Sequence, residues 1–498
     1  MEKLSLKLPA LLMLLSLLAG CAGLKPPHEG HLDAADSELR DCAQLYAHLD
    51  AVIGRAGVRD VGARRVEGYP YLRNDRFGAS FNVAVLQDER LREAWLARMH
   101  RLDASGREFE IANLPASALE SFGQPDRAAL LARTRDCAER LAREDRSVER
   151  ADAELAERAR VADDYSNGLR VVGLYELTRI PFHAGVRAWQ ERASETIAAA
   201  RQGAPPGAPL RRYRPPEAAG YSRNEVAELL ARAAEQPLGI AELTRRERDR
   251  LFATYAPAFE IESGGDYDRI GRLAWNADGL PVVDSANPTV YRRLDYTRLG
   301  ERTLLQLVYT AWFSERPPEH AFDLLAGRLD GLAWRVTLAP DGSPVLYDTI
   351  HPCGCYHQFF PTPRVEVIPA PEDAGEWAFV PATLPLIAEQ ERVVVSLQTR
   401  SHYLRDVYPS DAVTGKVYRF ADYDSLRAMP LPDGGSRSLF GADGLVAGSE
   451  RGERFLFWPM GISSAGAMRQ AGSQATAFVG RRHFDDADLI EKRFRLLD

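Results

Sequence analysis

Apolar residues recur every three or four positions through much of the first two hundred residues, which is the spacing of amphipathic helices. Leu91, Trp95, Met99 and Leu102 share one such face. Residues 151–161 are rich in alanine, glutamate, leucine and arginine, all strong helix formers. We therefore expect a helical domain over residues 37–201, with about six helices.

One stretch of this region, residues 169–189, is more apolar than the rest. Arg170, Glu176, Arg179 and Pro181 interrupt it, so it does not have the uncharged run of about 20 residues that crosses a bilayer. The pattern predicts a buried helix.

Residues 202–220 are rich in proline and glycine, which predicts an extended linker. Residues 221–256 then predict a pair of helices. Ser222 precedes Glu225 by three positions, and Thr244 precedes Glu247 in the same way. This is the spacing of a capping box, which marks where a helix begins.

From residue 257 to 498 the pattern changes to short strands separated by turns. Residues 302–313 are apolar on both faces, which favours a central strand, and residues 332–338 and 345–350 flank a turn and predict a hairpin. We expect further strands at 392–399, 416–420, 454–458 and 475–479, and short helices at 318–328 and 485–493. The fold class that follows is α+β, with a helical N-terminal region and a β-rich, mostly antiparallel C-terminal region.

The first twenty residues form a different kind of segment. Two lysines precede an uncharged apolar run, residues 10–18, which is about half the length of a membrane-spanning helix. The run ends in Leu18-Ala19-Gly20-Cys21. This ending resembles the lipobox of bacterial lipoproteins. The alternative is an ordinary secretory signal followed by a chance cysteine.

The resemblance implies that residues 1–20 are a signal peptide and that Cys21 carries the lipid, including palmitate. Ala22 and Gly23 follow the cysteine where acidic residues would favour inner-membrane retention. It therefore implies a protein anchored in the cell outer membrane and facing the periplasm. Residues 21–36 lack periodicity and predict a flexible tether.

Size and charge narrow the classes of function. A chain of 498 residues is too long for one core, so two or three domains are expected. The net charge of −8 does not favour nucleic acid as a partner, because nucleic-acid binding needs a basic surface. The partners that remain are the membrane, reached through the lipid, and envelope proteins.

Two cysteines in the helical region are candidates for a disulfide, because the compartment outside the inner membrane is oxidising. Cys42 and Cys137 each lie on the apolar face of a predicted helix, and each sits in the local sequence Arg-Asp-Cys-Ala. Packing of those two faces would bring the sulfur atoms together. The alternative is a pair of unbridged, buried thiols.

The strongest chemical signal is the cluster His351, Cys353, Cys355 and His357. These residues occupy every second position, so in an extended strand all four side chains point to one face. Imidazoles and thiols are ligands for zinc or copper. The spacing is too wide for all four to reach one ion, so a metal site needs a bend in the chain and an outside ligand such as His402 or His483.

Three other interpretations of this cluster remain open. In the first, Cys353 and Cys355 form a strained, redox-active disulfide. In the second, a cysteine acts as a nucleophile, with His357 or His402 as base and Asp348 or Asp406 orienting the base; the catalytic set is otherwise unknown. The third interpretation is purely structural, with a static bridge or two small buried residues.

The sequence therefore predicts a lipid-anchored envelope protein whose role is binding or structural. The alternative is a metal- or thiol-dependent enzyme, or a redox protein, centred on the 351–357 cluster.

Overall fold

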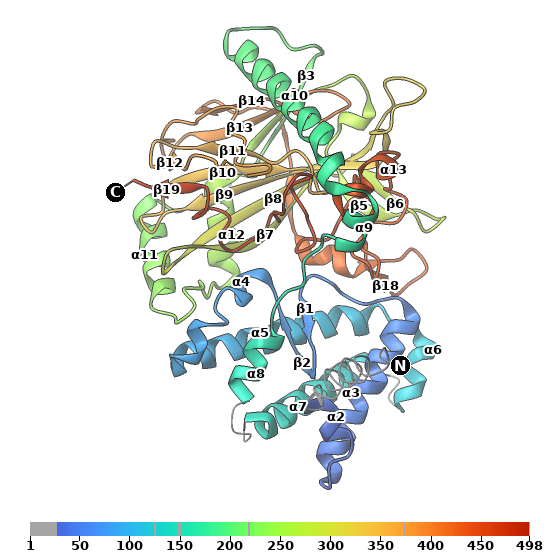
Figure 1. The fold of residues 1–498 in the computed structure, drawn as a ribbon. Helices are drawn as coiled ribbons and strands as arrows, with labels where there is room; N and C mark the ends of the chain where they lie inside the picture. The colour runs from blue at the N-terminus through green and yellow to red at the C-terminus, as the bar shows by residue number, and fades with distance from the viewer. Residues whose placement is uncertain (1–26, 124–125, 147–150, 218–219, 373, 498) are drawn as a thin grey trace, which may run out of the picture.

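The computed structural model describes residues 27–123, 126–146, 151–217, 220–372 and 374–497. The predicted signal peptide 1–20 and the lipidation site Cys21 lie outside these residues. Within them, no helix combines the length and the apolar character needed to cross a bilayer. The predicted α+β class is confirmed: Figure 1 shows a helical region below a β-rich region.

The helical region is built around one core that contains Tyr46, Leu49, Trp95, Met99 and Leu130. Its helices are α2 (Pro27–Leu32), α3 (Ser37–Ala56), α4 (Arg76–Ala79), α5 (Glu89–Ala112), α6 (Ala116–Leu119), α7 (Arg127–Arg146) and α8 (Ala151–Arg158). The tether predicted for residues 21–36 is therefore helical over α2, which packs on α3. His31 Nε2 of α2 lies 2.6 Å from Asp145 Oδ1 of α7, and this contact ties α2 to the helical core.

Two features of the helical region differ from the sequence prediction. The first is a β-hairpin, β1 (Arg64–Val66) and β2 (Tyr69–Asn74), which packs on α5. The second is the stretch predicted as a buried helix. It forms α9 (Asn167–Val172) and the start of α10 (Tyr175–Arg201), and Ile197 is the one buried residue of α10. Figure 1 shows α10 running along the outside of the β-rich region.

The β-rich region contains two large sheets. The first has six strands in the order β11-β10-β9-β8-β7-β16: β7 (Thr289–Leu299), β8 (Arg302–Arg316), β9 (Gly327–Leu338), β10 (Pro344–Ile350), β11 (Gln358–Pro361) and β16 (Arg419–Asp422). The second has five in the order β14-β13-β4-β3-β15: β3 (Leu210–Arg214), β4 (Ala258–Glu262), β13 (Arg392–Leu397), β14 (Leu404–Ser410) and β15 (Lys416–Val417). Leu307 and Trp334 of one sheet share a core with Phe259 and Val395 of the other.

Several predictions for this region are confirmed. β8 is central in its sheet, as its two apolar faces require. β9 and β10 form the predicted hairpin, and Asp341 accepts a hydrogen bond from the backbone of Ser343 in the turn. Both capping boxes are present, at the starts of α11 (Arg223–Ala234) and α12 (Arg245–Tyr255).

Other predictions for this part of the chain are wrong. The predicted linker 202–220 contains β3, which pairs with β4 because the chain is extended between its prolines. The predicted strand at 454–458 is instead the short helix α13 (Arg454–Phe457), because periodicity cannot decide so short an apolar run. Residues 475–479 contribute one isolated bridge instead of a strand.

The two short helices predicted at 318–328 and 485–493 are turns. In the first, Asp323 accepts hydrogen bonds from the backbone of Glu319 and Leu325, which favours a turn over a helix. Three small strand pairs complete the region: β5 (Arg272–Trp275) with β6 (Pro281–Asp284), β12 (Val365–Val367) with β19 (Phe494–Leu496), and β17 (Met429–Pro430) with β18 (Ser436–Arg437).

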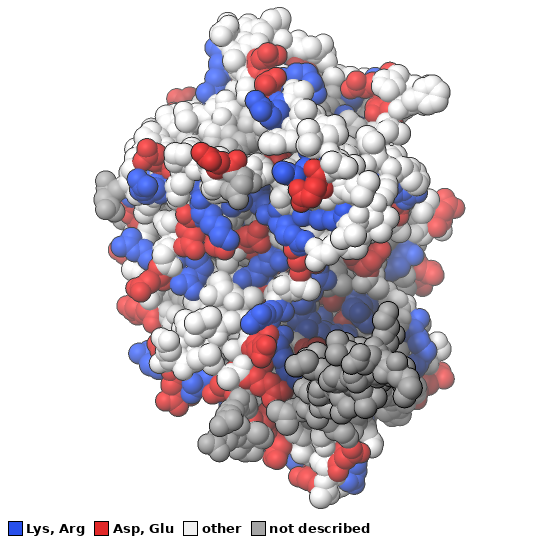
Figure 2. Space-filling model, viewed as in Figure 1, with Lys and Arg blue, Asp and Glu red and all other residues white. Residues whose placement is uncertain are grey.

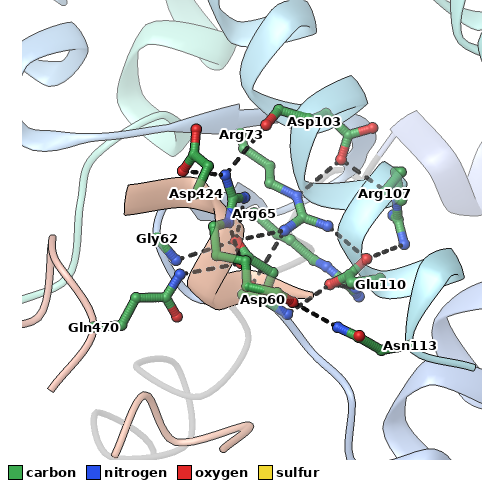
Figure 3. A network of polar contacts seen from close by, with 12 residues as sticks. Asp60, Gly62, Arg65, Arg73, Asp103, Arg107, Glu110, Asn113, Asp424 and Gln470 are labelled. Carbon is green, nitrogen blue, oxygen red and sulfur yellow. Dashed lines mark hydrogen bonds and ion pairs between the residues drawn. The ribbon is translucent and has the colours of Figure 1, made fainter. Parts of the chain in front are cut away.

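A buried ionic network joins the two regions (Figure 3). Arg427, which follows β16, donates hydrogen bonds of 2.7 and 2.8 Å to the two carboxylate oxygens of Asp60 in the helical region. Behind Asp60, the buried Arg73 donates a 2.7 Å hydrogen bond to Glu110 and a 3.0 Å one to Asp103. Each of these charges has a partner of opposite sign, and the Arg427–Asp60 pair connects the two regions.

Candidate ligand-binding site

The chain bends sharply at the cluster that the sequence singled out, in the turn between β10 and β11. His351 N–H donates to the Cys355 carbonyl at 3.0 Å, and Gly354 N–H donates to the His351 carbonyl at 2.8 Å. Gly354 has a φ of +93°, and a Cβ there would lie 2.3 Å from the Ala475 carbonyl oxygen. The extended strand that would align the four side chains is therefore not formed.

The two histidines of the cluster contact different carboxylates. His351 Nδ1 lies 3.0 Å from Asp330 Oδ1, whereas His357 Nε2 lies 2.8 Å from Asp348 Oδ2. Asp348 also accepts two hydrogen bonds from Arg335, of 2.8 and 2.6 Å. Burial lowers the pKa of His357 to about 3, so this imidazole is neutral at physiological pH.

Asp330 brings His402 into the same neighbourhood. His402 Nδ1 lies 2.8 Å from Asp330 Oδ2, and His402 Nε2 lies 3.3 Å from Asp268 Oδ1. Arg451 Nη2 lies 3.3 Å from Asp330 Oδ1. His402, which the sequence suggested as an outside metal ligand, is thus held between two buried carboxylates.

The thiols of Cys353 and Cys355 are free and buried. The Cys355 backbone N–H lies 3.4 Å from Cys353 Sγ, and the contact with Cys353 together with burial raises the pKa of Cys355 well above its usual value. A protonated, buried thiol such as that of Cys355 is a poor nucleophile. Of the proposed nucleophile–base–orienter sets, the structure pairs His357 with Asp348, while Asp406 lies by Arg201 on α10.

The part of the chain that the structure describes contains no preformed metal-binding site. No group of three or more histidine, cysteine, aspartate or glutamate side chains there is arranged to hold an ion. His483, the other suggested outside ligand, lies 3.3 Å from Asp486 and 3.5 Å from each of Asp163 and Asp164.

What the cluster does form is one wall of a pocket beneath α10. The pocket encloses about 790 Å³, a volume typical of small-molecule sites. Cys353, Cys355 and His357 line this wall, and side chains of α10, α13 and residues 462–478 line the others. Most of the lining is apolar and includes Phe182, Val186, Trp189, Leu325, Leu456, Phe457, Ile462 and Phe478.

Arg316, Tyr403 and Glu453 add polar groups to the pocket lining. Arg316 is 5% exposed and donates a 2.9 Å hydrogen bond to Tyr403 Oη. Glu453 is 3% exposed. Burial, opposed by Arg451 and Arg316, raises the pKa of Glu453 to about 7. Sequence reasoning missed Glu453 because it lies in a charged stretch that looks solvent-exposed.

Strained backbone surrounds this site. Six non-glycine residues in the described chain have positive φ. Four of them adjoin the network just described: Leu329 beside Asp330, Tyr356 beside His357, and Arg400 and His402. Such conformations persist where the surroundings impose them, and they concentrate at functional sites.

Exposed apolar side chains gather around the same pocket. Nine of the fifteen large, exposed apolar residues in the described chain lie on α9, the start of α10, the 319–325 loop and α13. We call this set the apolar rim: Val171, Val172, Leu174, Leu177, Ile180, Phe322, Leu324, Phe455 and Leu456. The Phe182 and Phe457 rings, 5.3 Å apart, join α10 to α13. In Figure 2 the surface over the start of α10 and α13 is largely white.

Glu453→Gln is expected to change how stability depends on pH. Because the pKa of Glu453 is raised from 4.5 to about 7 on folding, its contribution is fully present below pH 4.5 and is lost as pH rises through 7. Between pH 4.5 and 8, the free energy of unfolding of wild type should therefore fall by up to about 3 kcal/mol more than that of the variant. Urea unfolding of both proteins across this range measures the difference. If the free energies of unfolding of the two proteins change with pH in parallel, folding does not raise the pKa of Glu453.

Comparison with known proteins found no relative of this chain. No protein-family model, curated protein or solved structure matches the chain.

Proposed function

We propose that this protein is a lipoprotein of the bacterial cell envelope, anchored through Cys21, that binds an apolar, chain-like ligand in the pocket beneath α10. The observation that carries the proposal is the pocket itself, about 790 Å³ of largely apolar space roofed by a helix with one buried residue. Such a pocket with a few polar groups is the usual form of a small-molecule site.

A long chain suits this lining better than a small, compact ligand. Each methylene removed from water contributes about 0.8 kcal/mol, and association costs about 4–15 kcal/mol before any net affinity appears. A ligand that makes few polar contacts must therefore bury many methylenes. Phe182, Trp189 and Phe457 offer the apolar surface for this.

The apolar rim supports the same proposal. Contiguous exposed apolar surface is uncommon on soluble proteins and marks sites of contact with apolar partners. Here it lies on α9, the start of α10, the 319–325 loop and α13, so an apolar ligand would meet apolar side chains on its way in. Acylation at Cys21 would keep this surface near a membrane, where such ligands are abundant.

The direct test fills the pocket. Ala193 lines the pocket from α10, so Ala193→Trp should weaken binding of a fluorescent fatty acid, dansyl-undecanoate, about tenfold or more by steric exclusion. Titration of the chain from residue 21 onward, with Cys21→Ser to prevent acylation, measures the affinity.

The matched control is Ala198→Trp, which adds the same side chain on an exposed position of the same helix. It should bind the probe as wild type does. Equal binding by Ala193→Trp and wild type, or no binding by wild type, would contradict the proposal.

A further inference from the structure

Arg316 is unusual among the buried arginines of this protein. It is the last residue of β8, is 5% exposed and lines the pocket. It donates one hydrogen bond, to Tyr403 Oη, and its guanidinium carbon lies 4.9 Å from the centre of that ring. Among the described residues, Tyr403 is its side-chain hydrogen-bond partner, and Asp330 acts on it through charge alone, without an ion pair.

The other buried arginines in the described chain have stronger partners. Each lies within 4.0 Å of a carboxylate, donates to a backbone carbonyl, or does both: Arg73, Arg107, Arg170, Arg335, Arg451, Arg469, Arg482 and Arg493. A buried guanidinium that is left without such partners costs several kcal/mol. Arg316 has five N–H donors and uses one of them on a neutral phenol.

Glu453 is a buried carboxylate in the lining of the same pocket, yet it forms no ion pair with Arg316. Its carboxyl packs on Gly466, where a Cβ would lie 1.9 Å from Oε1. Gly466 has a φ of +83°, so this close approach depends on glycine. The two side chains line the same pocket without an ion pair, which leaves the free donors of Arg316 available to a ligand.

We propose that Arg316 binds the anionic head group, carboxylate or phosphate, of a long-chain amphiphile whose apolar chain occupies the rest of the pocket. This inference rests on the proposed function and names its ligand class. The guanidinium presents two parallel N–H groups to an oxyanion. The Tyr403 hydroxyl beside it can turn its own hydrogen toward the same group.

The test compares ligands that share a chain and differ in the head. Hexadecanoate and hexadecyl phosphate are titrated against methyl hexadecanoate and hexadecyltrimethylammonium, using the Cys21→Ser chain and displacement of a neutral alkyl probe. Hydrogen bonds to a charged group contribute about 1.5–3 kcal/mol, so wild type should prefer an anionic head roughly 10- to 100-fold over the ester. Whichever anion binds more tightly identifies the source of the head group.

Arg316→Gln should remove this preference for an anionic head, while Arg316→Lys should keep most of it. Arg419→Gln, an exposed arginine on β16, is the matched control and should behave as wild type. Equal affinity of wild type for anionic and neutral heads would overturn the inference, whether or not the variants fold, and would leave the proposed function intact. If no ligand in the series binds wild type, the proposed function fails first.

Discussion

Asp330→Asn is expected to lower the free energy of unfolding by about 3–5 kcal/mol, the range for breaking a buried ion pair. Asp330 is fully buried and contacts His351, His402 and Arg451. Burial alone would raise its pKa, but His351, Arg451 and the hydrogen bonds from both imidazoles hold the pKa of Asp330 well below its usual range. Asparagine cannot supply this charge, so Arg451 would remain buried with less compensation.

The loss should also reach the pocket. Asp330 ties the turn that contains His351 to the turn that contains His402, and both turns include residues with positive φ. Without Asp330, fewer contacts hold the backbone of these two turns in the conformation with positive φ. Chemical unfolding measures the stability, with Asp411→Asn as an exposed control that should stay within about 0.5 kcal/mol of wild type. A loss below about 1 kcal/mol for Asp330→Asn would contradict this role.

Removing the disulfide between Cys42 and Cys137 is expected to cost about 4 kcal/mol. The structure joins these residues across 95 positions of sequence, between α3 and α7, with their Cα atoms 5.1 Å apart. A cross-link over so long a loop stabilises mainly by restricting the unfolded chain. The Cys42→Ala/Cys137→Ala variant should therefore unfold at lower denaturant concentration.

A reducing agent supplies the control for this experiment. It should destabilise wild type by a similar amount and leave the double variant unchanged, because Cys353 and Cys355 are free thiols in the folded protein. Wild type that is equally stable with and without reductant would show that the bridge is absent or contributes nothing.

The sequence predicted local structure well where short-range chemistry decides it. Ser222 and Thr244 start their helices with the expected capping boxes, and the turn at Asp341 closes the expected hairpin. It failed where tertiary contacts decide. The apolar stretch at the start of α10 reads as a buried helix, because hydropathy cannot separate residues that enter a core from those that line a pocket or its rim.

The candidate site was predicted in part. The 351–357 cluster does form a wall of the pocket, but its bend depends on Gly354 fitting against Ala475, which is far away in sequence. Neither Arg316 nor Glu453 could be recognised as buried from the sequence. Their significance comes from the burial of both side chains in the lining of one pocket without an ion pair, and only the assembled fold creates that situation.

Native mass spectrometry of the Cys21→Ser chain with hexadecanoate tests most directly whether the pocket beneath α10 is a ligand-binding site. We expect one bound ligand per chain in wild type and in Ala198→Trp, and a far lower bound fraction in Ala193→Trp at the same ligand concentration. Absence of bound ligand in wild type, or one ligand per chain in all three proteins, would contradict the proposal that this pocket binds an apolar chain.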